Sequence, residues 1–277
     1  MKRKIKRTIS LFILLIFTTT TFAQTYTGQV LDESTKKPLE YVNIGVIGKD
    51  IGTVSNVNGH YNINVGTEFD NDSIRFSYTG YIPISIKMAD FKKQSHLISL
   101  KPQVFNLSEV VIKPIRVKEK KLGNNFKVFF QAGFKDNRKG YEMGVLLKIK
   151  KRAILHNISI KVSNCSYDSL CFRLNIYKET DKKTFVNVLR DPIYIFRKVP
   201  KSRFILNANL SDNKLNDIVV EGNTLVTMEF IKDLGKGGLY LASGMIGATS
   251  YCRKTSQGKW ESLPVKLGIS VDAEVEK

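Results

Sequence analysis

The sequence predicts an all-β protein that contains two β-sandwiches in succession. Short runs in which apolar and polar residues alternate with period two recur along most of its 277 residues, and a helical period is almost absent. Glycine, asparagine, aspartate and proline separate these runs, as expected for turns. The charge balance also changes: residues 24–112 contain 8 basic and 9 acidic residues, whereas residues 113–277 contain 31 and 16. We therefore expect two domains with different surface chemistry.

Residues 1–23 have the features of a signal peptide. A basic start precedes an apolar run from Ile9 to Phe17, which is too short to span a bilayer and therefore disfavours the alternative of an uncleaved anchor. Thr21 and Ala23 are small residues placed as a cleavage site requires. We expect the exported mature chain to begin at Gln24.

Residues 24–112 predict a β-sandwich of about seven short strands. Each run alternates apolar and polar residues, as do antiparallel strands with one buried face. The Asn58-Gly59 dipeptide lies between two such runs and predicts a β-hairpin with a type I′ turn. A third run, which contains Phe76 and Tyr78, is expected to pair with this hairpin, and Tyr61 is expected to join those two side chains in the core.

Several residues of this segment have the order and spacing of a known module. They are Gly28, Asp32, Pro38, Gly52, Thr53, Asn58, Gly59, Asp72, Gly80 and Tyr81. With these residues, the chain from about residue 25 to residue 112 resembles the carboxypeptidase regulatory-like domain. The resemblance implies a transthyretin-like β-sandwich that lacks a peptidase active site and in which these residues define the fold.

In Gram-negative bacteria, this module often precedes the plug and barrel of TonB-dependent outer-membrane transporters. The segment that begins at Leu107 is similar to the connector leading into such a plug. However, the residues after Ile112 are too few for a 22-stranded transporter barrel. The resemblance therefore implies the module without the transporter, in a protein of the periplasm or associated peripherally with the outer membrane.

Residues 113–127 are expected to form a charged linker because they show no apolar periodicity, with a solvated strand end as the alternative. Residues 128–277 then contain about eight alternating runs, which predict a second β-sandwich. A jelly roll is one arrangement that would fit this number of strands. This basic domain carries no motif of a specific family.

The motifs of common enzymes are missing from the sequence. None of His60, His96 and His156 has a second His or Glu at the spacing of a zinc peptidase. The glycines of residues 235–238 do not match a phosphate-binding loop, and Ser243 lacks the surroundings of a nucleophile elbow. We therefore expect no metal and no cofactor.

Paired carboxylates are the one catalytic arrangement that the sequence leaves open. A sandwich could bring together Glu142, Glu229 or Glu261, as glycoside hydrolysis would require. We expect a non-catalytic protein, and a hydrolase of surface glycan or peptide with its site in the second domain is the alternative.

The excess of basic residues is the most suggestive functional feature. Two groups are candidates for binding anions: Lys148, Lys150, Lys151 and Arg152, and Arg197, Lys198, Lys201 and Arg203. Because export argues against nucleic acid, we expect an envelope protein or an anionic surface glycan as the partner. A solvated surface that only keeps the domain soluble is the alternative. Tyr251 and Trp260 could stack on a sugar ring or belong to the core.

Three cysteines, Cys165, Cys171 and Cys252, are too few for a disulfide framework. Cys165 and Cys171 could form one disulfide if they flank a hairpin. Buried unpaired thiols are an equally good interpretation.

Overall fold

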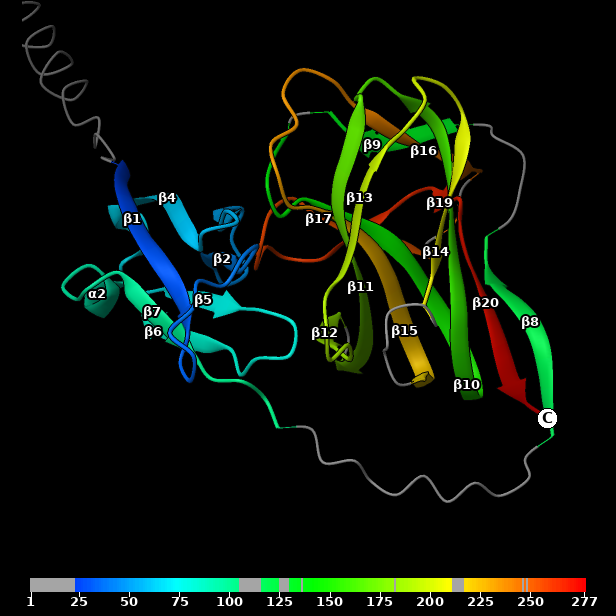
Figure 1. The fold of residues 1–277 in the computed structure, drawn as a ribbon, viewed down its shortest axis with the longest axis horizontal. Helices are drawn as coiled ribbons and strands as arrows, with labels where there is room; N and C mark the ends of the chain where they lie inside the picture. The colour runs from blue at the N-terminus through cyan, green and yellow to red at the C-terminus, as the bar shows by residue number, and fades with distance from the viewer. Residues whose placement is uncertain are drawn as a thin grey trace, which may run out of the picture.

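The computed structural model describes residues 23–104, 116–124, 130–135, 137–181, 183–210, 217–245, 247 and 249–277. The predicted signal peptide, apart from Ala23, and the connector at Leu107 lie outside these residues. Within the described part of the chain, no helix is both long enough and apolar enough to cross a membrane. Strands dominate the structure, which confirms the all-β prediction (Figure 1).

Over its described residues, 23–104, the first domain contains seven strands, one 3-10 turn and one short helix. Their bounds are β1 Ala23–Asp32, β2 Asn43–Val46, β3 Gly52–Val54, β4 His60–Gly66, η1 Thr67–Phe69, β5 Ser73–Ser77, β6 Ile84–Lys87, α2 Met88–Phe91 and β7 Leu97–Leu100. The second domain contains β8 Val117–Gly123, β9 Phe130–Phe134, β10 Glu142–Cys165, β11 Ser169–Asp181, β12 Thr184–Asn187, β13 Ile193–Lys198, β14 Phe204–Asn209, β15 Ile218–Phe230, β16 Leu239–Gly244, β17 Ser250–Arg253, β18 Glu261–Leu263, β19 Lys266–Leu267 and β20 Ile269–Glu276.

The first domain is a sandwich of two sheets, β4-β1-β7 and β3-β2-β5-β6. Its seven strands confirm the predicted number. Tyr61 and Phe76 lie in the core between the sheets, as expected, together with Met88 and Phe91 of α2. Tyr78 is only partly buried and turns its hydroxyl toward the second domain.

The predicted hairpin at Asn58-Gly59 is wrong in its pairing. β3 pairs with β2 and β4 pairs with β1, so this turn carries the chain from one sheet to the other. Gly59 has a φ of +72°, but Asn58 is not among the residues with positive φ, whereas a type I′ turn requires both. The side chain of Asn56 holds the turn by accepting hydrogen bonds from the N–H groups of Asn58 and His60. The third run forms β5, which pairs with β2.

Other residues of the recognised pattern stabilise turns and sheet contacts. The Asp32 carboxylate accepts hydrogen bonds from the N–H groups of Ser34 and Thr35 and from the Tyr81 hydroxyl, at 2.7–2.8 Å. These bonds lower the pKa of Asp32. Pro38 forms an isolated bridge with Leu31. Thr53 lies in β3, and Gly28 lies in β1 where it pairs with β4. Asp72 forms a surface ion pair with Lys49.

The second domain is built on one continuous sheet, for which 13 strands can be described. The 24-residue strand β10 belongs to both halves of this sheet: β15 and β17 pair with its first part, and β14, β16 and β20 pair with its later part. Its register with β15 shifts between Ile149 and Ala153. Apolar side chains from both halves meet in a single core, so the sheet folds over on itself in the manner of a sandwich.

The predicted linker at residues 113–127 needs correction where the structure describes it, at residues 116–124, and the alternative of a solvated strand fits better there. Residues 117–123 form β8, which pairs with β20 along its whole length. Six of its seven residues are exposed, and it carries lysines at 118, 120 and 121. This strand resembled a linker because an exposed edge strand has little apolar periodicity. Its lysines have a separate effect, since charged side chains on a sheet edge oppose pairing with other chains.

All three cysteines are buried and free, so Cys165 and Cys171 do not form a disulfide. Cys165 lies in the main core of the second domain, whereas Cys171 contacts Tyr41 and Val54 of the first domain. The two thiols therefore lie on different faces of the sheet.

Candidate functional site

The two domains meet through sheet faces whose sequences are polar. On β2 and β5 the side chains of Ile44 and Phe76 point into the first domain, and those of Asn43, Arg75 and Ser77 point outward. This outward face lies toward β11, β13 and β17 of the second domain (Figure 1). A face with the polar pattern of a solvated surface therefore lies at the domain interface, where Asn43 is buried and Arg75 and Ser77 are partly buried.

Four charged residues cross the second-domain sheet in one row beneath this interface. Their order across β17, β10, β15 and β11 is Arg253, Glu142, Glu229 and Arg173, each directly opposite its neighbour. Their exposed fractions are 7%, 0%, 0% and 1%, respectively. We call this row the ion ladder. Because the row places two carboxylates between two guanidinium groups, its formal charges balance.

Each carboxylate of the ion ladder has its own arginine. The Arg173 Nε and Nη2 atoms donate to Glu229 Oε2 at 3.0 and 2.8 Å. Arg253 Nε donates to Glu142 Oε2 at 2.7 Å, and its guanidinium lies 4.9 Å from the centre of the Trp260 ring. The Asn175 amide donates to both carboxylates at 2.9 Å.

The electrostatic environment shifts the pKa values of Glu142 and Glu229 in opposite directions. Burial raises the pKa of Glu142, and the nearby Glu229 carboxylate adds to this effect, although Arg253 opposes it. Burial also acts to raise the pKa of Glu229, but Arg173 and Arg253 outweigh it, so the pKa of Glu229 is lowered. Protons therefore bind to Glu142 before Glu229.

The first domain adds hydrogen bonds to Arg173 at one end of the ion ladder. Arg173 Nη1 donates to the backbone carbonyl of Tyr41 at 2.8 Å, and Nη2 also donates to the Asn43 side-chain oxygen. Beside them, the hydroxyl groups of Tyr78 and Tyr194 are 3.1 Å apart. Removal of the first domain would expose Arg173 to water, which would take the place of these two partners.

Two glycines allow the backbones of the domains to approach closely. A Cβ atom on Gly45 or Gly52 would lie 2.2 or 2.3 Å from the Ser256 carbonyl oxygen. Around this contact, Gly48 N–H donates to the Gln257 carbonyl, and the Gln257 amide donates to Ser77. Gly52, which the sequence pattern singled out, therefore serves the domain interface.

Residues 26–112 match the CarboxypepD_reg-like domain. No curated protein matches the chain. The CarboxypepD_reg-like domain thus accounts for the first sandwich, and the ion ladder lies in the part of the chain beyond this match.

The structure brings together two of the three predicted carboxylates. Glu142 and Glu229 are cross-strand neighbours, whereas Glu261 lies in β18 and pairs with Lys254. The neighbouring pair is sealed between the domains and held by arginines. This environment suits a structural ion network, and substrate would reach the pair only if the domains separated. The sequence did contain a signal that these residues are buried. Glu142, Arg173 and Glu229 each stand in a strand whose neighbouring residues are mostly apolar and buried.

The two predicted basic groups lie far apart. Lys148 pairs with Asn223, close to the end of β11, whereas Arg197 pairs with Leu170 at its beginning. On β11, Leu170 lies eight positions from Lys178, which pairs with Thr224 next to Asn223. Eight positions of strand correspond to about 26 Å. Lys148, Lys150 and Lys151 are exposed at the register shift of β10, Arg152 is partly exposed there, and the second group is exposed on β13 and the loop after it. The structure therefore presents two separate basic surfaces.

The predicted stacking residues belong to a packed cluster. Trp260 is 8% exposed and packs against Tyr177 and Phe185, and Tyr251 packs against Phe185. Trp260 therefore contributes to packing, the alternative that the sequence left open.

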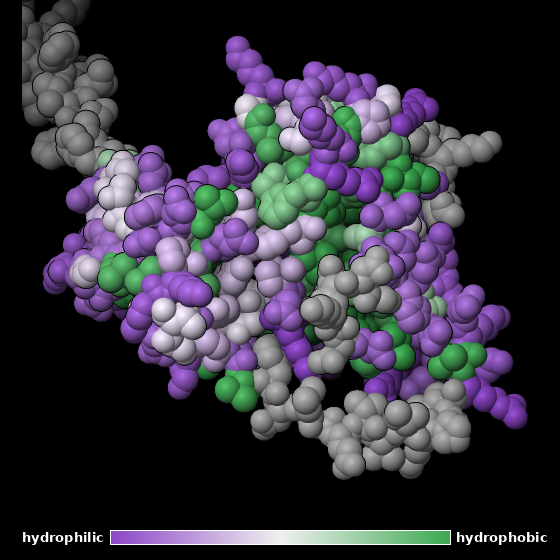
Figure 2. Space-filling model, in the orientation of Figure 1, coloured by the Kyte–Doolittle hydropathy of each residue, from purple (hydrophilic) through white to green (hydrophobic). Residues whose placement is uncertain are grey.

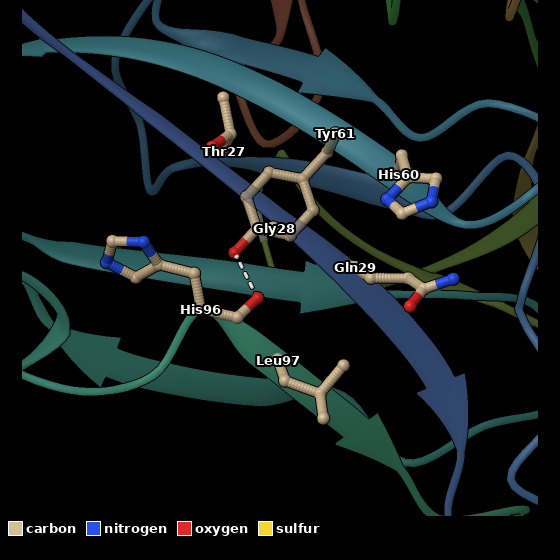
Figure 3. A pocket seen from close by; sticks show the side chains of 7 residues that line it. All are labelled: Thr27, Gly28, Gln29, His60, Tyr61, His96 and Leu97. Atoms are coloured by element: carbon tan, nitrogen blue, oxygen red, sulfur yellow. Dashed lines mark hydrogen bonds between the residues drawn. The ribbon is translucent and has the colours of Figure 1, made fainter.

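A shallow depression on the first domain contains two of the three histidines. Its volume is about 550 Å³, and Thr27, Gly28, Gln29, His60, Tyr61, His96 and Leu97 line it. Figure 3 shows His60 and His96 on opposite sides of β1, with the Tyr61 hydroxyl donating to the His96 carbonyl at 3.0 Å. The His96 ring stacks on Phe91. Among the described residues, no three His, Cys, Asp or Glu side chains are grouped as a metal site would require.

Proposed function

We propose that this chain is an exported, non-catalytic cell-envelope protein of a Gram-negative bacterium that binds an anionic surface glycan through its second domain. The observation that carries the proposal is the exposed basic group at the register shift of β10. Within the described residues, none of Lys148, Lys150, Lys151 and Arg152 forms an ion pair. In contrast, Lys201 of the other basic group is engaged by Asp168 at 2.9 Å.

The register shift explains why these side chains are available. Between Ile149 and Ala153, β10 has three residues where β15 has only Glu221, so those three residues do not follow the regular ladder. Phosphate and carboxylate groups of a surface polysaccharide or lipopolysaccharide are suitable ligands for such cations.

Hydrophilic residues cover much of the visible surface of the molecule, while apolar residues gather over the second domain (Figure 2).

The sealed ion ladder supports a binding role over a catalytic one. Glu142 and Glu229 are fully buried, and arginines neutralise both carboxylates. A glycoside hydrolase needs its two carboxyl groups on either side of an accessible glycosidic bond. The hydrolase alternative would require the domains to open.

Binding to purified lipopolysaccharide and to polygalacturonate tests the proposal. We expect the wild type to bind at least one of them, with an affinity that falls as salt rises. The K148A/K150A/K151A variant should bind roughly tenfold more weakly, whereas the charge-matched control K87A/K93A/K101A in the first domain should bind like the wild type. Equal binding by both variants, or binding to neither glycan, would contradict the proposal.

Two further measurements separate the alternatives. Release of reducing ends from these glycans, abolished in E142Q, would establish a hydrolase and refute the non-catalytic function. Capture of one envelope protein by the wild type but not by K148A/K150A/K151A, without glycan binding, would replace the glycan with a protein partner.

A further inference from the structure

We infer that the outer face of β4-β1-β7 in the first domain binds an uncharged polysaccharide. The topology limits the choice of surface. The four-stranded sheet of this domain turns its outer face to the second domain, where Asn43 and Ser77 are hydrogen-bonded. As far as the described residues show, the three-stranded sheet keeps its outer face exposed in the assembled protein, with Thr25, Thr27 and Asn62 open to solvent.

Most side chains on this open face are polar, and none of them belongs to Lys, Arg, Asp or Glu. Cross-strand pairs join Thr25 to Asn64, Thr27 to Asn62, and Gln29 to His60. On the other side of β1, Gln29 pairs with Leu97 and Leu31 with Ser99. Lys, Arg, Asp and Glu are all missing from these positions, although they make up 25% of the chain. We call this surface the neutral face.

Several hydrogen-bonding groups of the neutral face are available to a ligand. Thr27, His60 and Asn62 are exposed, and within the described part of the chain their side chains have no hydrogen-bond partner. Hydroxyl, imidazole and amide groups both donate and accept hydrogen bonds, as do the hydroxyl groups of a sugar. The absence of charge complements a ligand without charge, since an ionic ligand would gain little here.

The depression gives the neutral face a place to hold a sugar ring. Its volume of about 550 Å³ lies within the range of small-ligand sites, roughly 300–1,000 Å³. Leu97, which is 53% exposed, and the His60 ring line it with apolar surface against which sugar C–H groups can pack (Figure 3). Beneath it, the Tyr61 hydroxyl is already bonded to the His96 carbonyl, so the floor is preformed.

The test uses the whole mature chain and three soluble uncharged polysaccharides: dextran, mannan and xylan. We expect binding to at least one of them, with an affinity that does not change with salt concentration. The T27A/N62A variant removes two hydrogen-bonding groups from the neutral face and should bind roughly tenfold more weakly. Both side chains are exposed, and a thermal unfolding midpoint close to that of the wild type will show that the variant folds.

The control distinguishes this inference from the proposed function. The K148A/K150A/K151A variant lacks the basic group of the second domain and should bind the uncharged polysaccharide like the wild type. Failure to bind dextran, mannan and xylan would overturn the inference, as would equal binding by T27A/N62A and the wild type. Binding that weakens with salt and depends on Lys148, Lys150 and Lys151 would also overturn it, while leaving the anionic-glycan proposal intact.

Discussion

The guanidinium of Arg173 in the second domain donates a 2.8 Å hydrogen bond to the backbone carbonyl of Tyr41 in the first domain. Arg173 is also bonded to Glu229, so a single buried side chain connects the ion ladder with the domain interface. Since both ends of this connection are buried, the two domains should unfold together rather than independently.

Arg173→Ala should be strongly destabilising. It leaves the Glu229 carboxylate buried without its main partner, which costs about 3–5 kcal/mol in the free energy of unfolding. Urea denaturation measures this loss. Lys201→Ala provides the control, because it breaks an ion pair whose side chains are 62% and 87% exposed and should cost less than about 1 kcal/mol. Similar small losses in both variants would show that the ion ladder is not coupled to stability.

Glu142→Gln and Glu229→Gln should change the pH dependence of stability in opposite directions. The pKa of Glu142 is raised above 4.5 in the folded state, so its contribution to stability is complete below that pH and declines as pH rises. The wild type should therefore lose stability relative to E142Q above pH 4.5. The pKa of Glu229 is lowered, so the wild type should lose stability relative to E229Q as pH falls below 4.5. Unfolding free energies measured across this pH range provide the test, and shifts of the same sign would contradict the assignment.

Gly45→Ala and Gly52→Ala should weaken the domain interface. Each adds a methyl group 2.2–2.3 Å from the Ser256 carbonyl oxygen, so the backbones must separate, at a cost of about 1–3 kcal/mol. A larger radius of gyration in X-ray scattering should accompany the loss of stability. Gly48→Ala is the control: its φ of +72° imposes backbone strain, but its methyl group meets no atom within 4 Å. If all three variants keep the wild-type radius, the close approach is not required for docking.

The cysteines should behave as three buried thiols. Burial raises the pKa of Cys252 to about 11, and it also raises the pKa of Cys165 and Cys171. A thiol-specific chromogenic reagent should react slowly with the native chain, because little thiolate is present. After denaturation without reductant, all three cysteines should react. A single reactive cysteine per denatured chain would indicate a disulfide.

Local alternation made much of the first domain predictable. A period of two identifies which side of a strand faces a core, and Tyr61 and Phe76 are buried as this pattern requires. It does not identify the partner strand. The Asn58-Gly59 turn therefore appeared to close a hairpin, although it connects strands of different sheets.

The domain interface was harder to predict because its contacts are far apart in the sequence. Asn43 and Arg173 are separated by 130 positions, and each lies on a strand whose polar side could equally face water. Arg173 stands between the fully buried residues Phe172 and Leu174, a position where an exposed strand face would be expected. Only the fold reveals that this face is covered by another domain.

The close contact of Gly45 and Gly52 with Ser256 also limits how this protein could arise or be rebuilt by recombination. A related module from another protein could supply the same sandwich, yet a side chain at either position would weaken its docking. Conversely, this module transplanted elsewhere would expose Asn43 and Arg75 on a face shaped for a specific neighbour. The two halves of the chain are therefore expected to be inherited as a matched set.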